Sequence, residues 1–246
     1  RVVGLCDSSG VVADPAGISP HRLDAIAREK ERGRPLSRMS GGRRSTPSAA
    51  IADLARHALA SPIVVDLTAD ETTPVLCAAL ESGMDLVLAN KRPLAGSTKD
   101  AERLRALAAA HGRRIRSEAT VGAGLPILDT HQKLVESGDR VLSIEGCLSG
   151  TLGFLFAELE VGRPFSAALR AAMDAGLTEP DPRDDLSGAD VGRKALILAR
   201  LLGFRGEPSD VAVESLVPAA LRRVSVDVLL TRLPELDASW KKRIDA

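Results

Sequence analysis

The segment 176–194 concentrates charged side chains at a junction between a loop and a helix. It reads Gly-Leu-Thr-Glu-Pro-Asp-Pro-Arg-Asp-Asp-Leu-Ser-Gly-Ala-Asp-Val-Gly-Arg-Lys, with five carboxylates and three cations. Two prolines prevent an ordinary helix in the first half, and a helical pattern begins after Ser187. A rigid loop with more carboxylates than cations is suited to binding a positively charged group such as an ammonium.

Asp190 and Lys194 lie four residues apart on the predicted helix 188–202, beside an apolar stripe on the same helix. The stripe consists of Val191, Ala195, Leu198 and Leu202. One interpretation is structural: Ser187 and Asp190 form a capping box, and Asp190 with Lys194 adds a salt bridge of about 0.3–0.5 kcal/mol. The other is an acid–base pair, in which a partly desolvated lysine exchanges protons near neutral pH.

Two other segments have residue types that suit chemistry. Asn90-Lys91 directly follows a predicted strand, so Lys91 is either solvated or faces a ligand crevice. The bend at 121–126 is rich in glycine, which serves a tight turn or, with Glu118, exposes oxygen atoms to a hard cation. Because Gly122-x-Gly124 lacks the third glycine at the required spacing, this bend is not the dinucleotide-binding fingerprint.

The elements that would position these residues alternate between strand and helix. The predicted order is strand 63–67, helix 71–82, strand 86–88, helix 97–110 and strand 115–118. This order predicts an α/β fold with a Rossmann-like, doubly wound parallel sheet. The β-branched run 63–67 is typical of a strand buried on both faces. Ligands of such sheets bind outside the carboxyl ends of the strands, where the loops 68–70 and 89–93 begin.

The pattern changes after residue 118, so we predict two domains. Residues 1–118 would form a partial nucleotide-binding domain, and 119–246 a partial α+β domain that binds substrate. The first also has a predicted strand at 2–6, a mobile loop at 33–48 and a helix at 51–59. The second has predicted strands at 141–147 and 211–217, and helices that start at 149–151, cover 165–175 and cover 188–202.

The composition argues against nucleic acids and membranes as partners. The 246 residues have a formal net charge of zero, with four Phe, one Trp and no Tyr, which disfavours nucleic acid and anionic membranes. Three distant cysteines favour a reducing compartment, the cytoplasm. The scattered histidines show no zinc spacing, and no apolar run reaches about 18 residues.

Several segments in the same order resemble homoserine dehydrogenase along essentially the whole chain. They are 63–68, 89–93, 118–126, 138–139, 145–151 and, most specifically, 177–194. The resemblance implies reversible reduction of L-aspartate 4-semialdehyde to L-homoserine with NADP or NAD, in threonine, methionine and isoleucine biosynthesis. It also implies a homodimer that takes a small amino-acid substrate.

The same resemblance implies roles for individual residues. Lys194 would exchange the proton at the alcohol oxygen with Asp190 beside it, and Lys91 is a second candidate between nicotinamide and substrate. The residues implied to bind substrate are Glu179, Asp185, Asp190, Thr151 and Gly150. Those implied to border the cofactor are Thr68, Ala69, Asn90, Lys91, Gly176 and Ser8. Main-chain carbonyls of Val121, Ala123 and Leu125, with Glu118, would bind a monovalent cation, Na⁺ or K⁺.

The chain also departs from the pattern of the family. Leu177 stands where many members have Tyr, and Gly192 stands where Ala is usual, at a cost of up to about 1 kcal/mol in a helix. The strand 2–6 resembles the second strand of the family, with Asp7, Ser8 and Ser9 near the cofactor ribose. The Gly-x-Gly phosphate loop would therefore precede residue 1, and further substrate-domain strands would follow residue 246. We expect the 246 residues alone to bind NAD(P) weakly or not at all.

Two other functions are consistent with parts of the sequence. One is a fragment or non-catalytic descendant that keeps the fold and binds a small amino acid. The other is a semialdehyde dehydrogenase, whose chemistry needs a nucleophilic cysteine and a nearby base. Cys147 is the candidate nucleophile, but no histidine lies near it in sequence.

Overall fold

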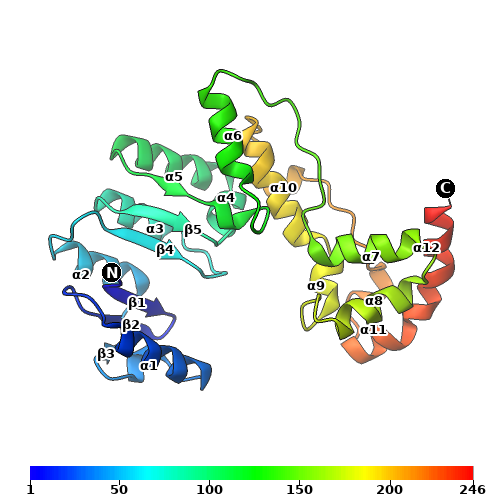
Figure 1. Cartoon of the computed structure of the whole chain (residues 1–246), viewed down its shortest axis with the longest axis horizontal. Coiled ribbons are helices and arrows are strands. Elements are labelled where there is room, and N and C mark those ends of the chain that lie inside the picture. Colours follow the sequence, from blue (N-terminus) through cyan, green and yellow to red (C-terminus); the bar gives the residue numbers. More distant parts are fainter. Residues whose placement is uncertain (246) are drawn as a thin grey trace. The chain divides into compact units, whose positions relative to one another are not determined.

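The computed structural model describes residues 1–245, which form two compact units (Figure 1). The first unit is Arg1–Thr120, and the second begins at Val121. The units therefore divide two residues beyond the domain boundary expected from the sequence. No helix in the described part of the chain is long and apolar enough to cross a membrane.

The first unit contains the parallel sheet that the alternating pattern predicted. Its strands are β4 (Ile63–Asp66), β5 (Asp85–Leu88) and β6 (Ile115–Arg116), with β5 in the middle. Both pairings are parallel, with Val64 opposite Leu86 and Leu86 opposite Ile115. The connections contain α3 (Thr73–Glu81) and α5 (Thr98–Ala110), so the predicted helices at 71–82 and 97–110 are confirmed.

One face of this sheet is buried and the other is open along β4. Leu86 and Leu88 of β5 are fully buried, and α3 packs against both β5 and α5. Successive side chains of a strand alternate between faces, and on β4 the alternate residues Ile63 and Val65 are 58% and 55% exposed. The expectation that β4 is buried on both faces is therefore wrong, because the apolar run does not show which face receives a covering layer.

The first strand of the unit belongs to a separate antiparallel sheet. It comprises β1 (Gly4–Asp7), β2 (Gly10–Ala13) and the short β3 (Gly42–Arg43). Three further helices complete the first unit: α1 (Pro20–Glu31), α2 (Pro47–Ala55) and the short α4 (Arg92–Ala95), which packs against α5.

The segment 33–48 has more structure than the mobile loop expected from its composition. It contains a 3₁₀ helix, Leu36–Arg38, followed by β3 and the start of α2. Leu36 and Met39 are buried with Val12, Ile18 and Ile26. The expectation failed because these two apolar residues anchor a segment that is otherwise rich in Arg, Gly and Ser. Helix α2 begins earlier than predicted, because Thr46 caps it and Pro47 is its first residue.

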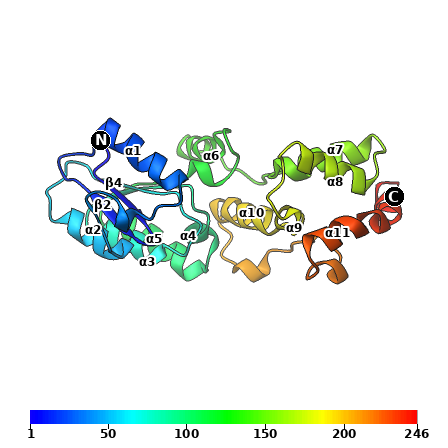
Figure 2. The same ribbon diagram turned by 90° about the horizontal axis from the view of Figure 1, so that it is seen from below.

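The second unit is built from helices. They are α6 (Ile127–Glu136), α7 (Gly150–Glu160), α8 (Phe165–Asp174), α9 (Pro182–Leu186), α10 (Ala189–Leu201), α11 (Val226–Arg232) and α12 (Asp237–Ile244). Short 3₁₀ helices cover Glu118–Thr120 at the end of the first unit, and Pro208–Asp210, Ala219–Leu221 and Leu233–Leu236 in the second. Helices α7 and α8 lie side by side in both views (Figures 1 and 2). In the core of this unit, Phe165 stacks on Trp240 with ring centroids 4.9 Å apart.

The two strands predicted for this unit, 141–147 and 211–217, are absent, and residues 121–245 contain no strand. A strand requires a neighbouring strand for its backbone hydrogen bonds, and neither segment has one within these residues. Leu142 is 79% exposed, so its segment also lacks a covering layer. The α+β character expected for the second domain is therefore wrong for the described residues.

Candidate functional site

Lys194 projects from α10 and is held by two oxygen atoms. Its Nζ donates to the carbonyl oxygen of Leu148 at 2.7 Å and lies 2.9 Å from Oδ2 of Asp190, one helical turn away. The lysine side chain is 18% exposed, against 43% for that of Asp190. The pair predicted from the i,i+4 spacing is present. The contact with Leu148 places the ammonium beside the segment that leads into α7.

The start of α10 differs from the predicted capping box. Its N-cap residue is Gly188, which has a φ of +71°, and no side chain caps the helix. A left-handed φ strongly favours glycine. Ser187 instead donates to the carbonyl of Asp184 and accepts from the backbone of Ala189. The prediction failed because Ser187 ends the preceding helix α9, and the chain needs one more residue to turn.

Three of the five carboxylates of the charged junction, Asp181, Asp185 and Asp190, have partners. Asp181 caps α9 by accepting from the backbone of Arg183, and it also accepts from the guanidinium of the same residue. Hydrogen bonds from that guanidinium are the main reason that the pKa of Asp181 is lowered. Pro182 follows at the first position of α9, where a proline costs no hydrogen bond. Within the first half of the junction, helix begins only at Pro182, and residues 176–181 are not helical.

Asp185 joins two segments that were predicted to bind substrate. Its Oδ1 lies 3.0 Å from the hydroxyl of Thr151, which also lies 2.6 Å from the carbonyl of Leu177. Its Oδ2 accepts from the backbone of Glu179 at 2.8 Å. Asp185 therefore fixes the first turn of α7 against the loop 177–179.

Two carboxylates of the junction remain available to a ligand. The side chains of Glu179 and Asp184 are exposed and make no hydrogen bond or ion pair within residues 1–245. Gly176, with a φ of +66°, ends α8 as predicted, and Leu177 beside it is 44% exposed. Gly150 is the first residue of α7, whose N-cap is Ser149. An ammonium would find a free carboxylate at Glu179, close to the Thr151–Asp185 contact.

The structure gives a reason for Gly192. A Cβ at this position would lie 2.7 Å from Cγ2 of Val213, which is closer than carbon atoms pack. The segment around Val213 therefore lies against α10 at the point where the helix has no side chain. The helix-propensity cost of Gly192 is offset by this close packing.

In the first unit, a polar cluster lies where β4 and β5 end. Asp66, the last residue of β4, accepts hydrogen bonds from Thr68, Thr72 and Asn90. Burial acts to raise the pKa of Asp66, but these hydrogen bonds outweigh it and hold the pKa below its usual value. Thr68 and Ala69 are exposed above this cluster, and Lys91 is half-buried.

Sequence reasoning included Thr68 and Asn90 but missed Asp66. The sequence feature that could have identified Asp66 is a carboxylate at the end of an apolar run, followed two residues later by a residue with a hydroxyl group. The same spacing, Asp-x-Ser or Asp-x-Thr, occurs at Asp7, and both aspartates turn out to be centres of hydrogen bonding.

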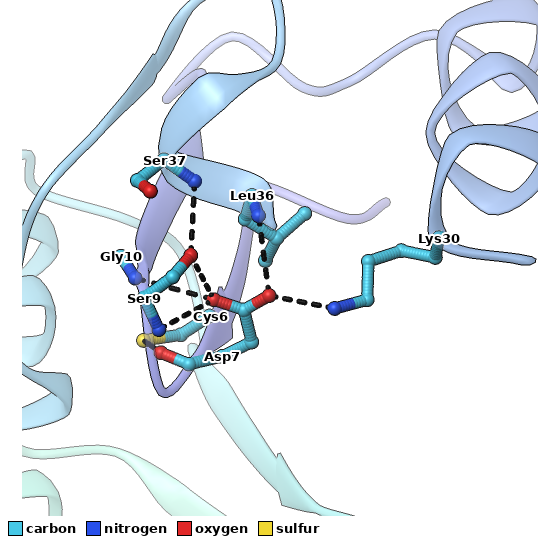
Figure 3. Close-up of polar contacts among 7 residues, drawn as sticks. All are labelled: Cys6, Asp7, Ser9, Gly10, Lys30, Leu36 and Ser37. Carbon is cyan, nitrogen blue, oxygen red and sulfur yellow. Dashed lines mark hydrogen bonds and ion pairs between the residues drawn. The ribbon is translucent and has the colours of Figure 1, made fainter. Parts of the chain in front are cut away.

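Asp7 ties together the antiparallel sheet and the segments around it (Figure 3). Its Oδ1 accepts from the backbone and hydroxyl of Ser9, and its Oδ2 accepts from Lys30 at 2.7 Å and from the backbone of Leu36 at 3.2 Å. Ser8, which lies between Asp7 and Ser9 in the chain, is exposed at the turn. Of the residues expected near the cofactor ribose, Asp7 is thus already engaged, and Ser8 is the accessible one.

The residues expected to bind a monovalent cation lie where the two units divide. Glu118 starts a 3₁₀ helix, Val121 is buried, and Leu125 is exposed. Ala123 has a φ of +51°, which turns its carbonyl away from an ordinary extended path. Within residues 1–245, no group of three or more His, Cys, Asp or Glu side chains suits a metal ion.

Comparison with known proteins gives two family matches. Residues 126–244 match the sequence model described as "Homoserine dehydrogenase", and residues 2–118 match "Homoserine dehydrogenase, NAD binding domain". The resemblance seen in the sequence motifs is thereby confirmed on both units.

The three cysteines are free, and Cys147 donates to the carbonyl of Ser149, so nothing at this residue favours a nucleophile.

Individual relatives agree with these matches. A chloroplastic bifunctional aspartokinase/homoserine dehydrogenase of Daucus carota is 39% identical over 100% of the chain and 26% of its own length. A Candida auris protein of unknown function has a TM-score of 0.84 and 32% identity, over 100% of this chain and 68% of that one. Homoserine dehydrogenase of Thermoplasma acidophilum has a TM-score of 0.63 and 27% identity, over 85% and 62%. The chain spans about a fifth to a quarter of the curated relatives it matches.

Proposed function

Since this chain belongs to the homoserine dehydrogenase family, whose members are NAD(P)-dependent oxidoreductases, we propose that the polypeptide containing it reduces L-aspartate 4-semialdehyde to L-homoserine. The reaction is reversible and belongs to threonine, methionine and isoleucine biosynthesis. The observation that carries the proposal is the placement of Lys194 between Asp190 and the carbonyl oxygen of Leu148. Leu148 lies three residues before Thr151 in the chain.

Lys194 supplies the proton of the reaction. As the carbonyl carbon of the substrate is reduced, its oxygen gains negative charge and takes a proton from the nearby ammonium. Asp190 keeps the lysine in place through their ion pair. In the reverse direction, neutral Lys194 accepts the hydroxyl proton of homoserine. Lys91 is the second candidate for this proton transfer.

The amino-acid end of the substrate binds at the charged junction. Glu179 has a free carboxylate for the α-ammonium, and Asp185 orders the loop that carries it. Thr151 and Gly150 at the start of α7 border the same place, and Asp190 joins it through its ion pair with Lys194. This arrangement explains why a loop with more carboxylates than cations is useful to the protein.

The nucleotide, NADP or NAD, binds at the carboxyl ends of β4 and β5 and supplies a hydride when bound. The residues there fit the nicotinamide end, because Thr68 and Ala69 are exposed above the polar cluster that Asp66 and Asn90 form. Lys91 extends this border, with Ser8 nearer the ribose.

Three finer features are also proposed. A monovalent cation, Na⁺ or K⁺, binds carbonyl oxygens of Val121, Ala123 and Leu125 with Glu118. The protein is a homodimer, as the resemblance implies. It works in a reducing compartment, which the free cysteines support; we propose the cytoplasm, although the carrot relative is described as chloroplastic.

The test uses the full-length polypeptide that contains these residues. Lys194→Ala should lower kcat for reduction of the semialdehyde by about 10²–10⁴-fold, the range of general acid–base catalysis. The measurement is oxidation of NADPH, followed by absorbance, at saturating semialdehyde. Asp190→Ala should also lower kcat, by a smaller factor.

Lys133→Ala is the matched control. Lys133 forms the same kind of i,i+4 pair, with Asp129 on α6, but its side chain is 71% exposed and lies outside the proposed site. It should leave kcat unchanged. If Lys194→Ala stays within a few-fold of the wild type, Lys194 is not the proton donor. If the wild type binds an amino acid but reduces nothing, the protein is a non-catalytic descendant.

A further inference from the structure

The loop after β4 is organised around one buried carboxylate. Asp66 is 5% exposed. Its Oδ1 accepts from the backbone of Thr68 at 3.0 Å and from the hydroxyl of Thr68 at 2.8 Å. Its Oδ2 accepts from the hydroxyl of Thr72 at 2.5 Å. The carboxylate therefore holds both ends of the loop 67–72.

The loop after β5 is attached to the same carboxylate through Asn90. The amide of Asn90, which is 3% exposed, donates to Oδ2 of Asp66 at 3.1 Å and to the carbonyl of Asp70 at 2.8 Å. Its oxygen accepts from the backbone of Arg92 at 3.0 Å, at the start of α4. Backbone groups of Ala89 and Asn90 also donate to the carbonyl of Asp66. Lys91 lies between two residues that this arrangement fixes.

Only a carboxylate can accept all four hydrogen bonds that attach the two loops to this position. All four hydrogen bonds described above need an acceptor at Asp66, two at each oxygen. An asparagine in its place presents one oxygen and one NH₂ group. Whichever way its amide turns, the NH₂ group meets an N–H donor, either the backbone of Thr68 at the Oδ1 position or the amide of Asn90 at the Oδ2 position. At least one buried N–H group then lacks its acceptor, which is costly.

We propose that Asp66 is a positioning residue, which fixes the loops after β4 and β5 in one arrangement and so places Thr68 and Lys91 for the nucleotide. This inference rests on the proposed function, because it assumes that these loops border the cofactor. Asp66 itself is buried beneath them and touches neither cofactor nor substrate in this role.

The test compares Asp66→Asn with Asp85→Asn in the full-length polypeptide. Asp85 is the matched control, because it also accepts a backbone hydrogen bond, from Arg114, but at the opposite end of β5. Asp66→Asn should raise KM for NADPH by about 10-fold or more and change kcat less, because the loops must be reordered on binding. In hydrogen exchange without nucleotide, amides of 67–72 and 89–95 should exchange faster. Asp85→Asn should change neither.

The outcomes separate this inference from the proposed function. If the wild type does not reduce the semialdehyde, the proposed function fails, and exchange in the two loops still decides whether Asp66 orders them. If the wild type is active and Asp66→Asn lowers only the melting temperature, with KM unchanged, Asp66 is merely structural and the inference is overturned. Faster exchange in one loop alone would also overturn it.

A second pair of variants covers the case in which Asp66→Asn does not fold. Thr72→Val removes one hydroxyl donor while keeping the shape of the side chain, and it should raise KM for NADPH in the same direction by a smaller factor. Thr72→Ser keeps the hydroxyl and should restore the wild-type KM. Equal KM values for the three proteins would contradict the inference.

Discussion

Asp7 and Asp66 occupy equivalent local positions but are stabilised in different ways. Each ends a strand, and each accepts from the backbone and hydroxyl of a Ser or Thr two residues later. Asp7 also pairs with Lys30, and its side chain is 20% exposed. Asp66 is nearly fully buried, and the hydrogen bonds described for it come from neutral donors.

The difference shows that a local motif determines where a carboxylate points, whereas distant residues determine what it does. Lys30 and Leu36 bring α1 and the following 3₁₀ helix to Asp7, so this residue stabilises the packing of the antiparallel sheet. Thr72 and Asn90 bring the loops after β4 and β5 to Asp66. A charge partner near the surface suits a structural clamp, and neutral donors suit a buried support beneath a binding site.

The largest effect that separates the two aspartates should be on stability. Asp66→Ala leaves several buried donors without an acceptor, and we expect a loss of about 3 kcal/mol in the free energy of unfolding. Urea unfolding of the purified protein measures this loss. A loss below about 1 kcal/mol would mean that water replaces the carboxylate, and the site would then be less buried than the structure shows.

Asp7→Ala should cost less, about 1–2 kcal/mol, because water can reach part of its cluster and solvate the released donors. The same urea experiment measures it. Lys30→Met is the control for the ionic part: Lys30 is 45% exposed, so its loss should cost below about 1 kcal/mol. If Asp7→Ala were more destabilising than Asp66→Ala, the contrast between the clamp and the buried support would be wrong.

Acid sensitivity should show the smallest difference. For Asp7 as for Asp66, burial acts to raise the pKa, but hydrogen bonds outweigh it and lower the pKa, most strongly in Asp7, where Lys30 contributes. A carboxyl whose pKa is lowered by folding stabilises the folded state. This contribution is fully present when the pH is above the pKa of the unfolded chain, about 3.9, and it is lost as the pH falls through the pKa of the folded state.

The unfolding free energy of the wild type should therefore decline below about pH 4. Asp66→Asn and Asp7→Asn should each make that decline shallower, by at most about 1.4 kcal/mol per pH unit. The flattening should extend to lower pH for Asp7→Asn, since the pKa of Asp7 is lowered further. Urea unfolding at several acidic pH values measures the slopes, and parallel slopes in all three proteins would contradict the assignment.

The local pattern of the sequence predicted the parallel sheet, because its strands and helices have the lengths and periodicities of βαβ units. It also predicted that Lys194 and Asp190 share one side of a helix. These predictions depend on residues close together in the chain. The helix ends at Gly176 and Gly203 were predictable for the same reason.

The failures concern partners that are distant in sequence. The apolar segments 141–147 and 211–217 fit a strand, but no neighbouring strand pairs with them within residues 1–245. Ile63 and Val65 fit a buried strand, but the sequence does not say which face a helix covers. One further difference is local: Asp181 pairs with Arg183, two residues away, and this pair removes a carboxylate from the excess, because spacing does not specify side-chain direction.

The contact between Gly192 and Val213 has a consequence for how this protein tolerates change. Val213 occupies the volume that a methyl group at position 192 would need. A larger residue at 192 is acceptable only if the side chain of Val213 rotates away, if 213 becomes smaller or if its segment moves. The two positions should therefore be exchanged together among functional variants, and the fitness of a substitution at either one depends on the residue present at the other.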